Sequence, residues 1–268
     1  NGFQTYSNRS HLAFAELTQA WSTATNARDF FGQILNLPFY KALAFTLTYT
    51  FVVTPFVIVI GLGIALGVNA LPSKIKGPTI FVSLLPMIVT PLIGSLILFW
   101  MIDAQGILGA TLQRLFNDNA LSLKASPSLT WVMLFVYGVW HSAPFSFIVF
   151  YAGLQSVPSE TLEAAMIDGA SRWQRVRYVV IPYLTPLVTF ITLMQLMDNF
   201  RVFEPIVGFS ASANATSLSW IIFNDLRGQD SQLFGSAAAT SMLTILGVAI
   251  LLTPVLIRTW REFNSKTV

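Results

Sequence analysis

The chain has 268 residues, of which 54% are hydrophobic and only 10% are charged. Since about a quarter of the residues in an ordinary soluble domain are charged, this composition excludes a soluble globular protein and indicates a membrane protein. The net charge of +3 comes with no pattern that combines aromatic and basic residues, so it gives no support for nucleic-acid binding. Cysteine is absent and the two histidines, His11 and His141, lie far apart, so the sequence offers neither disulfides nor a metal site.

Five apolar stretches are long enough to cross a bilayer, which requires about 20 residues. They lie at 42–70, 78–102, 129–154, 181–197 and 233–257. Several prolines fall inside them, namely Pro55, Pro86, Pro91, Pro144 and Pro254. Each proline removes a backbone hydrogen bond that neighbouring helices must compensate, which favours a packed bundle over isolated helices. We therefore expect an all-α, polytopic membrane protein whose transmembrane domain covers residues 42–257.

The distribution of basic residues predicts which loops face the cytoplasm, because Lys and Arg are enriched in cytoplasmic loops. The segments 71–77, 155–180 and 258–268 carry Lys74, Lys76, Arg172, Arg175, Arg177, Arg258, Arg261 and Lys266. The segments on the other side are together considerably longer and hold Arg9, Arg28, Lys41, Arg114, Lys124, Arg201 and Arg227. We therefore place 155–180 and the tail 258–268 in the cytoplasm and the N-terminal segment 1–41 outside.

The cytoplasmic segment 155–180 has the sequence of two short helices joined by a bend. Ser159 is expected to cap the first helix, with Glu160 in its first turn, where the helix dipole favours a carboxylate. Gly169 is suited to the left-handed residue that ends this helix. The run Ser171-Arg172-Trp173-Gln174 fits a capping box, so a second helix should begin at once.

The first of these helices should form a small knob. Leu162, Ala165 and Met166 recur at helical spacing and give it an apolar face, while Glu163 gives that face an acidic flank. A knob of this kind suits docking into another protein. From the residues alone, the alternative is an amphipathic linker that lies on the membrane surface.

Two runs of this segment carry a family resemblance. Residues 163–170 read Glu-Ala-Ala-Met-Ile-Asp-Gly-Ala, and residues 179–182 read Val-Val-Ile-Pro. In their spacing they resemble the cytoplasmic EAA loop of permeases from binding-protein-dependent ABC importers, with conservative variants at two aliphatic positions. Residues 152–158, Ala-Gly-Leu-Gln-Ser-Val-Pro, are similar to the run that precedes this loop in permeases of the carbohydrate or maltose-transporter type, and 200–204 is similar to the end of their fifth span.

This resemblance implies a permease of the type I ABC importer kind in a bacterial inner membrane. Such a permease pairs with a second, homologous permease and docks on two ATP-binding cassette ATPase subunits. It receives a sugar or a sugar-like solute from an external, periplasmic binding protein. The residues that the resemblance assigns to ATPase coupling are Leu162, Glu163, Ala164, Ala165, Met166, Asp168 and Gly169.

The resemblance also implies that ATP and Mg belong to the partner ATPase. The chain itself has no Gly-rich phosphate loop with its Lys and Ser/Thr, so we expect a transport subunit without a cofactor of its own and not an enzyme. The core of such permeases has six spans, and this sequence starts at Asn1 in a predicted external segment without a signal peptide. We therefore expect an upstream span that the sequence does not include; the alternative is a genuine external N-terminus.

Polar side chains inside the spans are candidates for a solute pathway, because such groups are costly in a membrane. They are Tyr137, Gly138, His141 and Ser142 in the third stretch and Gln195 and Asn199 in the fourth. The last two are four residues apart and share one helix face. Neutral hydrogen-bonding groups beside aromatic rings suit a sugar, and by position they match segments that line the sugar site of the maltose-type relative. A role in holding the helices together is equally open.

The main alternative function is an ion-coupled secondary transporter of a small polar solute. That class needs ionisable residues near the bilayer midplane and usually internal repeats, whereas these spans are nearly free of charge and show no repeat. An intramembrane hydrolase would need a nucleophile and a base, and His141-Ser142 lack a third partner. Co-purification of a nucleotide-binding subunit would separate an importer permease from both.

Overall fold

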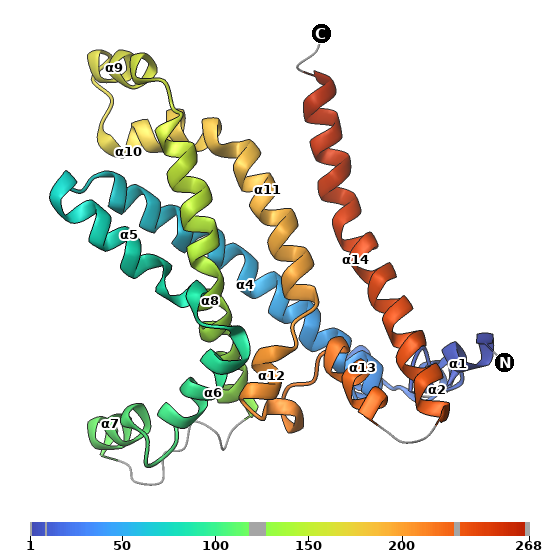
Figure 1. The fold of residues 1–268 in the computed structure, drawn as a ribbon. Helices are drawn as coiled ribbons and strands as arrows, with labels where there is room; N and C mark the ends of the chain where they lie inside the picture. Colours follow the sequence, from blue (N-terminus) through green and yellow to red (C-terminus); the bar gives the residue numbers. More distant parts are fainter. Residues whose placement is uncertain (1, 9, 118–126, 228–230, 266–268) are drawn as a thin grey trace.

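The computed structural model describes residues 2–8, 10–117, 127–227 and 231–265, and every regular element among them is helical (Figure 1). The long apolar elements are α4 (Pro38–Asn69), α5 (Ser73–Ile88), α6 (Pro91–Met101), α8 (Pro127–Gln155), α11 (Ile181–Phe200) and α14 (Ser231–Ser265). The shorter elements are α1 (Gly2–Ser7), α2 (Phe14–Thr23), α3 (Ala27–Leu35), α7 (Ile107–Phe116), α9 (Ser159–Ile167), α10 (Arg172–Arg175), the π-helix Val176–Val180, α12 (Glu204–Gly208), the 3-10 helix Ala211–Ala213 and α13 (Leu218–Arg227).

Among the described residues, four helical stretches are long and apolar enough to cross a membrane. They are Pro38–Asn69, Pro127–Gln155, Arg172–Phe200 and Leu233–Arg261. These stretches overlap the predicted spans 42–70, 129–154, 181–197 and 233–257. The expectation of an all-α bundle of membrane helices is therefore confirmed.

The stretch 78–102, predicted as one span, is a bent pair of helices that forms either a broken span or a re-entrant loop. The axes of α5 and α6 differ by 93°. The break falls at Val89 and Thr90, whose backbones are extended, with ψ of 126° and 144°. Thr90 precedes Pro91, and the proline ring disfavours the α conformation of the residue before it. The proline therefore separates α5 from α6 and begins the second helix.

Residue 180 is the predicted boundary between the cytoplasmic segment and the fourth span. The helix continues across this boundary without interruption. From Arg172 to Phe200 the chain forms one continuous helical stretch that includes α10, the π-helix Val176–Val180 and α11. Pro182 has no N–H with which to bond the carbonyl four residues before it. The wider π-turn ends just before this proline and accommodates the missing hydrogen bond. The basic helix is therefore continuous with the span.

The helix α4 occupies the centre of the bundle and packs along α8 and α11. Its buried residues Phe45 and Val53 belong to one core cluster with Leu134 of α8. Gly61 lies so close to the backbone of α8 at Ser146 that a side chain at this position would overlap it. Small residues at such crossings let membrane helices approach closely. Gly61 therefore lets α4 and α8 pack closely.

Each end of the bundle carries the segments that the basic residues predict for that side of the membrane. In Figure 1 the start of α5, the helix α9 and the last turns of α14 lie at the upper end, and α7 lies at the lower end with α1, α2 and α13 toward it. The segments 71–77 and 155–180 and the end of α14 thus share one side of the bundle. A common cytoplasmic face requires this arrangement.

Candidate functional site

The predicted bend after the first cytoplasmic helix is present. Gly169 has a positive φ of 77°, the left-handed conformation that glycine adopts without strain. The N–H of Ala170 donates to the carbonyl of Ala165 at 2.9 Å, which is the long hydrogen bond of a Schellman motif. The prediction for Gly169 is confirmed, and this residue ends α9.

The two predicted helix starts have different outcomes. The capping box at the second helix is confirmed, since the Ser171 N–H donates to Gln174 Oε1 at 2.7 Å and the Gln174 N–H donates to Ser171 Oγ at 3.3 Å. The prediction of Ser159 as the cap of α9 is wrong. Pro158 is the N-cap, in an extended conformation with ψ of 127°, and Ser159 is the first helical residue without a capping hydrogen bond. The fixed φ of the proline already provides the change of direction at this position.

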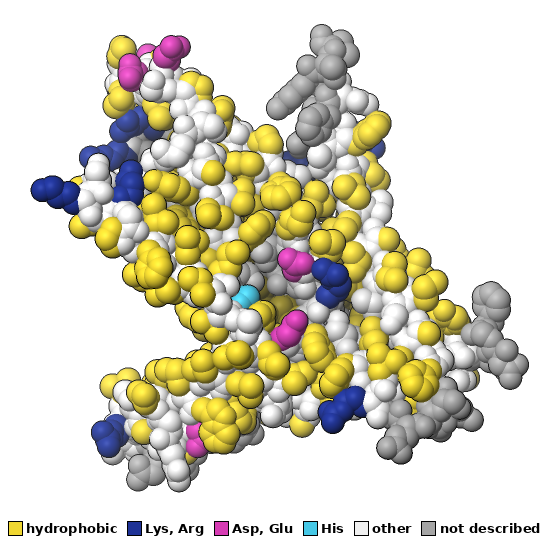
Figure 2. Space-filling view, viewed as in Figure 1, with side chains coloured by type: hydrophobic (Ala, Val, Ile, Leu, Met, Phe, Trp, Pro, Cys, Tyr) yellow, Lys and Arg dark blue, Asp and Glu magenta, His cyan; other side chains and the backbone are white. Residues whose placement is uncertain are grey.

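The predicted knob is present, but its three predicted apolar residues are not exposed to the same degree. Leu162 and Ala165 are half-buried, and Leu162 packs against the core cluster at the ends of α4 and α8. Met166 is 49% exposed, and Ile167, which was not among the residues predicted for the knob, is 87% exposed. Glu163, Ala164 and Asp168 are exposed on the same helix. Figure 2 shows acidic side chains at the tip of this region. Large apolar groups exposed beside acids on a protruding helix are typical of a protein-docking surface.

The six predicted pathway residues all line one cavity. Its volume is about 680 Å³, and it lies between α8, α11, α4 and the break between α5 and α6. The predicted residues that line it are Tyr137, Gly138, His141, Ser142, Gln195 and Asn199. The structure therefore brings together two groups of side chains that lie more than fifty positions apart in the chain.

Two of these residues also hold the broken helix. The Tyr137 hydroxyl donates to the Pro91 carbonyl at 2.7 Å, and His141 Nε2 lies 3.2 Å from the Val89 carbonyl. Tyr137 and His141 are one helical turn apart on α8, so both face the break. The break leaves the Val89 carbonyl outside both helices, and His141 supplies a donor for it, while the Tyr137 hydroxyl adds a bond to the first carbonyl of α6. His141 is thus a satisfied interior residue, as its isolation in the sequence indicates.

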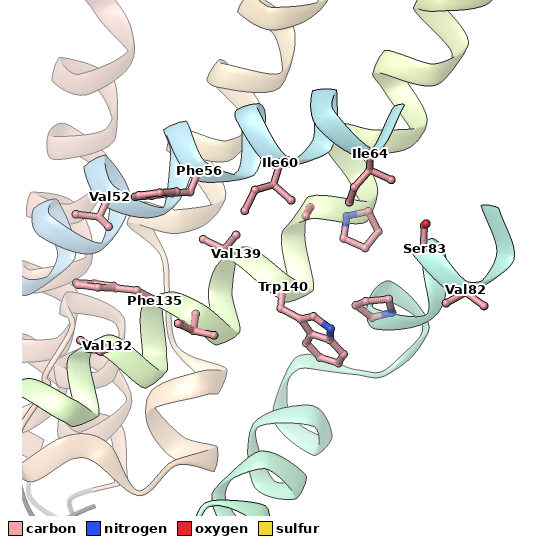
Figure 3. A pocket seen from close by; sticks show the side chains of 14 residues that line it. Val52, Phe56, Ile60, Ile64, Val82, Ser83, Val132, Phe135, Val139 and Trp140 are labelled. Atoms are coloured by element: carbon pink, nitrogen blue, oxygen red, sulfur yellow. The ribbon is translucent and has the colours of Figure 1, made fainter. Parts of the chain in front are cut away.

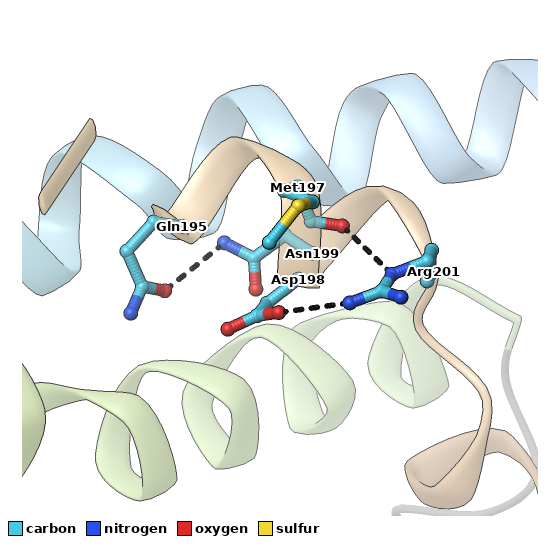
Figure 4. Close-up of polar contacts among 5 residues, drawn as sticks. All are labelled: Gln195, Met197, Asp198, Asn199 and Arg201. Carbon is cyan, nitrogen blue, oxygen red and sulfur yellow. Dashed lines mark hydrogen bonds and ion pairs between the residues drawn. The ribbon is translucent and has the colours of Figure 1, made fainter. Parts of the chain in front are cut away.

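Gln195 and Asn199 form an amide pair on the predicted common face (Figure 4). Asn199 Nδ2 donates to Gln195 Oε1 at 3.4 Å and to Thr54 Oγ1 of α4 at 3.0 Å. Both side chains are buried, and both line the cavity. Among the described residues, the side-chain oxygen Asn199 Oδ1 and the side-chain nitrogen Gln195 Nε2 have no hydrogen-bond partner. The pair therefore keeps one acceptor and one donor for a further molecule.

Several residues of the cavity were not identified from the sequence. One is Arg201, which pairs with Asp198 at 3.2 Å (Figure 4), and another is Glu204, which lines the same cavity from the start of α12. Tyr49 enters the cavity from α4, and its hydroxyl occupies the space that a side chain at Gly138 would fill. The run 200–204 could have indicated the charged group, because it places two charges directly after an apolar span. Nothing in the sequence pairs Tyr49 with Gly138.

A second cavity has a different chemistry (Figure 3). It has a volume of about 630 Å³ between α4, α5 and α8, and its lining includes Phe56, Ile60, Val139 and Trp140. Ser83 and the indole of Trp140 are the polar groups among its lining side chains. Hydrocarbon walls suit acyl chains or an apolar helix, and they offer sugar hydroxyls too few partners. Among the described residues no group of three or more His, Asp or Glu side chains could hold a metal ion.

Comparison with known proteins identifies the class. The family described as "Binding-protein-dependent transport system inner membrane component" matches residues 30–261, and the chain belongs to this family. The chain is therefore a multi-pass inner-membrane component of a transport system and not an enzyme, as the EAA resemblance predicted.

Individual relatives agree with this class. The chain is 32% identical to the multiple sugar-binding transport system permease protein MsmF of Streptococcus mutans, over 90% of this chain and 85% of that protein. It is 26% identical to the trehalose/maltose transport system permease protein MalF of Thermococcus litoralis, over 78% of this chain and 70% of that protein. A solved bacterial ABC transporter that imports alginate has a chain with the same fold, with a TM-score of 0.73, 20% identity, and coverage of 93% of this chain and 88% of that chain.

Proposed function

We propose that this chain is a permease subunit of a bacterial ATP-driven importer and that it carries a sugar or a sugar-like solute. The observation that carries the proposal is the cavity in which the aromatic and amide side chains of α8 and α11 meet. The names of the relatives support the solute class, since they describe transport of multiple sugars and of trehalose or maltose. An external binding protein would deliver the solute to the end of the bundle opposite α9.

The unused groups of the amide pair fit the chemistry of a sugar. A sugar hydroxyl donates and accepts hydrogen bonds, so two neighbouring hydroxyls can pair with the Asn199 carbonyl oxygen and the Gln195 amide nitrogen at once. The rings of Tyr49 and Phe145 lie on the same cavity and can pack against the C–H face of a sugar. The cavity volume of about 680 Å³ is that of a site for a small ligand.

The exposed knob on α9 fits the coupling role that the family resemblance implies. Glu163, Met166, Ile167 and Asp168 present acid and apolar surface at one end of the bundle, beyond the membrane helices. We infer that this surface docks on an ATPase subunit that binds ATP and Mg. A second, homologous permease with its own ATPase subunit would complete the transporter, and the exposed apolar faces of α6 and α14 provide surface for lipid and for this partner.

The experiment is to purify the tagged chain from membranes and to reconstitute the product into vesicles. An ATPase subunit should co-purify with the wild-type chain and be lost with Glu163→Lys, because the reversed charge would face a basic group. Uptake of labelled carbohydrates should require ATP and persist when an ionophore removes ion gradients. An ion-coupled transporter would give the opposite result in both measurements.

A further inference from the structure

A recess lies at the ends of α4 and α8 on the side of the coupling helix. It has a volume of about 430 Å³. Leu66, Leu154 and Val180 belong to its aliphatic wall, and Asn69, Arg172 and Arg175 belong to its polar side. Asn69 is held in place by the Gln155 side chain, whose Nε2 donates to Asn69 Oδ1 at 3.0 Å. The recess thus combines two cationic groups with hydrocarbon.

The two arginines of the recess lack an anionic partner. The ion pair found among the described residues joins Arg201 to Asp198 and involves neither of them. Arg175 Nε is buried and has no hydrogen-bond partner. A buried donor on a charged group is expensive to leave unpaired. Because a guanidinium presents a planar fork of donors that matches carboxylate and phosphate oxygens, the missing partner has the chemistry of an oxyanion, and a phosphate fits it.

The recess lies at the level where lipid headgroups would be. Trp173 and Tyr178, on the same helical stretch as the two arginines, are 66% and 70% exposed. Exposed Trp and Tyr side chains at the end of an apolar helix are typical of the membrane–water interface. From Arg172 the chain runs without a break into the apolar span. Figure 2 shows Lys and Arg side chains gathered below the acidic tip of α9.

We propose that this recess binds an anionic phospholipid, with its phosphate on Arg172 and Arg175 and an acyl chain against the aliphatic wall. A soluble phosphate would satisfy the arginines but would leave the apolar wall unused. Leu162 of the coupling helix also lines the recess. A lipid bound here therefore contacts the side of α9 that packs on the bundle. Anionic lipid thus helps to hold the docking surface in position.

The test is lipid retention by the purified full chain in detergent, measured by native mass spectrometry with phosphatidylglycerol and phosphatidylethanolamine as probes. The wild-type chain should retain more phosphatidylglycerol than phosphatidylethanolamine. Arg175→Gln should lower this retention roughly tenfold, as the loss of a charge-assisted hydrogen bond requires. Arg177→Gln is the matched control, because Arg177 is exposed, does not line the recess and lies over the Tyr178 ring at 5.9 Å. Equal retention of both lipids, or an equal loss in the two variants, would overturn the proposal.

Two further arms identify the source of the phosphate and guard against a folding defect. Glycerol phosphate, which has the headgroup chemistry without acyl chains, should not displace the retained lipid. Displacement at equal concentration would overturn the lipid assignment in favour of a soluble phosphate. Val157→Phe fills the recess and keeps both arginines, so it should also lose phosphatidylglycerol. Undiminished retention by this variant would overturn the proposal even if Arg175→Gln fails to fold.

Discussion

Asn199 of α11 and Thr54 of α4 are joined by a buried hydrogen bond of 3.0 Å, although 145 residues separate them in the chain. The Asn199 nitrogen makes this bond and also a second one to Gln195, so the side chain holds two helices together. Its side-chain oxygen Oδ1 has no partner among the described residues. Helix packing and solute contact, which the residues alone leave open, are therefore compatible at this position.

The amide pair can be separated into a packing and a solute component. Gln195→Ala removes the free donor together with the Asn199–Gln195 bond and leaves the Asn199–Thr54 bond in place. It should raise the half-saturating solute concentration roughly 5- to 30-fold, because an unmatched hydrogen bond in a desolvated site costs about 1–2 kcal/mol. Uptake by reconstituted vesicles measures this.

Thr54→Val is the matched control for Gln195→Ala. It removes the partner of Asn199 on α4 and leaves the free donor and acceptor intact, so it should lower thermal stability with little change in the half-saturating concentration. If Gln195→Ala instead dissociates the transporter and abolishes its basal ATP hydrolysis, the amide pair serves helix packing alone.

The bend after the coupling helix depends on Gly169. Its φ of 77° is costly for a residue with a side chain, by about 1–2 kcal/mol for alanine. Gly169→Ala should therefore weaken co-purification of the ATPase and reduce transport while the chain still inserts. Gly63→Ala is the control, since Gly63 is in the middle of α4 and has open space around it. Unchanged ATPase binding in the Gly169 variant would contradict the coupling role.

We expect the Tyr137 hydroxyl to stabilise the packing of α8 against the broken helix. Tyr137→Phe removes the hydrogen bond to the Pro91 carbonyl, and a bond of this kind contributes about 0.5–1.5 kcal/mol. We expect a lower thermal unfolding temperature for this variant in detergent. Tyr178→Phe, which removes an exposed hydroxyl, should leave the unfolding temperature unchanged. Equal unfolding temperatures for all three proteins would show that the bond to Pro91 contributes nothing.

The predicted sidedness can be tested because the native chain has no cysteine. A cysteine at Ser73, which is exposed at the start of α5, should be protected from a membrane-impermeant thiol reagent in intact cells. One at Gln105, exposed between α6 and α7, should react. The reverse labelling pattern would invert the orientation.

The sequence predicts the spans and the coupling loop well because each depends on local chemistry. Apolar length identifies the helices, and the Ser171–Gln174 capping box and the Gly169 bend are set by neighbouring residues. The break at Val89 and Thr90 was missed although Pro91 lies inside the stretch. A proline in a membrane helix can be tolerated or can break it, and the donors Tyr137 and His141 that compensate the break come from another helix.

The sequence predicts six of the residues that line the cavity and does not predict Arg201, Glu204 or Tyr49. Gln195 and Asn199 stand out because they are polar within an apolar span. Tyr49 does not, since an aromatic residue in a span is ordinary, and its place over Gly138 results from the packing of α4 on α8. Long-range packing of this kind has no signal in a single sequence.

The most direct test of the solute pathway uses a single introduced thiol. Ser142 lines the cavity, and Ser142→Cys places one reactive group there in a chain that otherwise has none. A water-soluble thiol reagent should block ATP-dependent uptake by reconstituted vesicles, and saturating solute should slow both the modification and the loss of uptake. If the fully modified protein transports at the normal rate, the solute does not pass through this cavity.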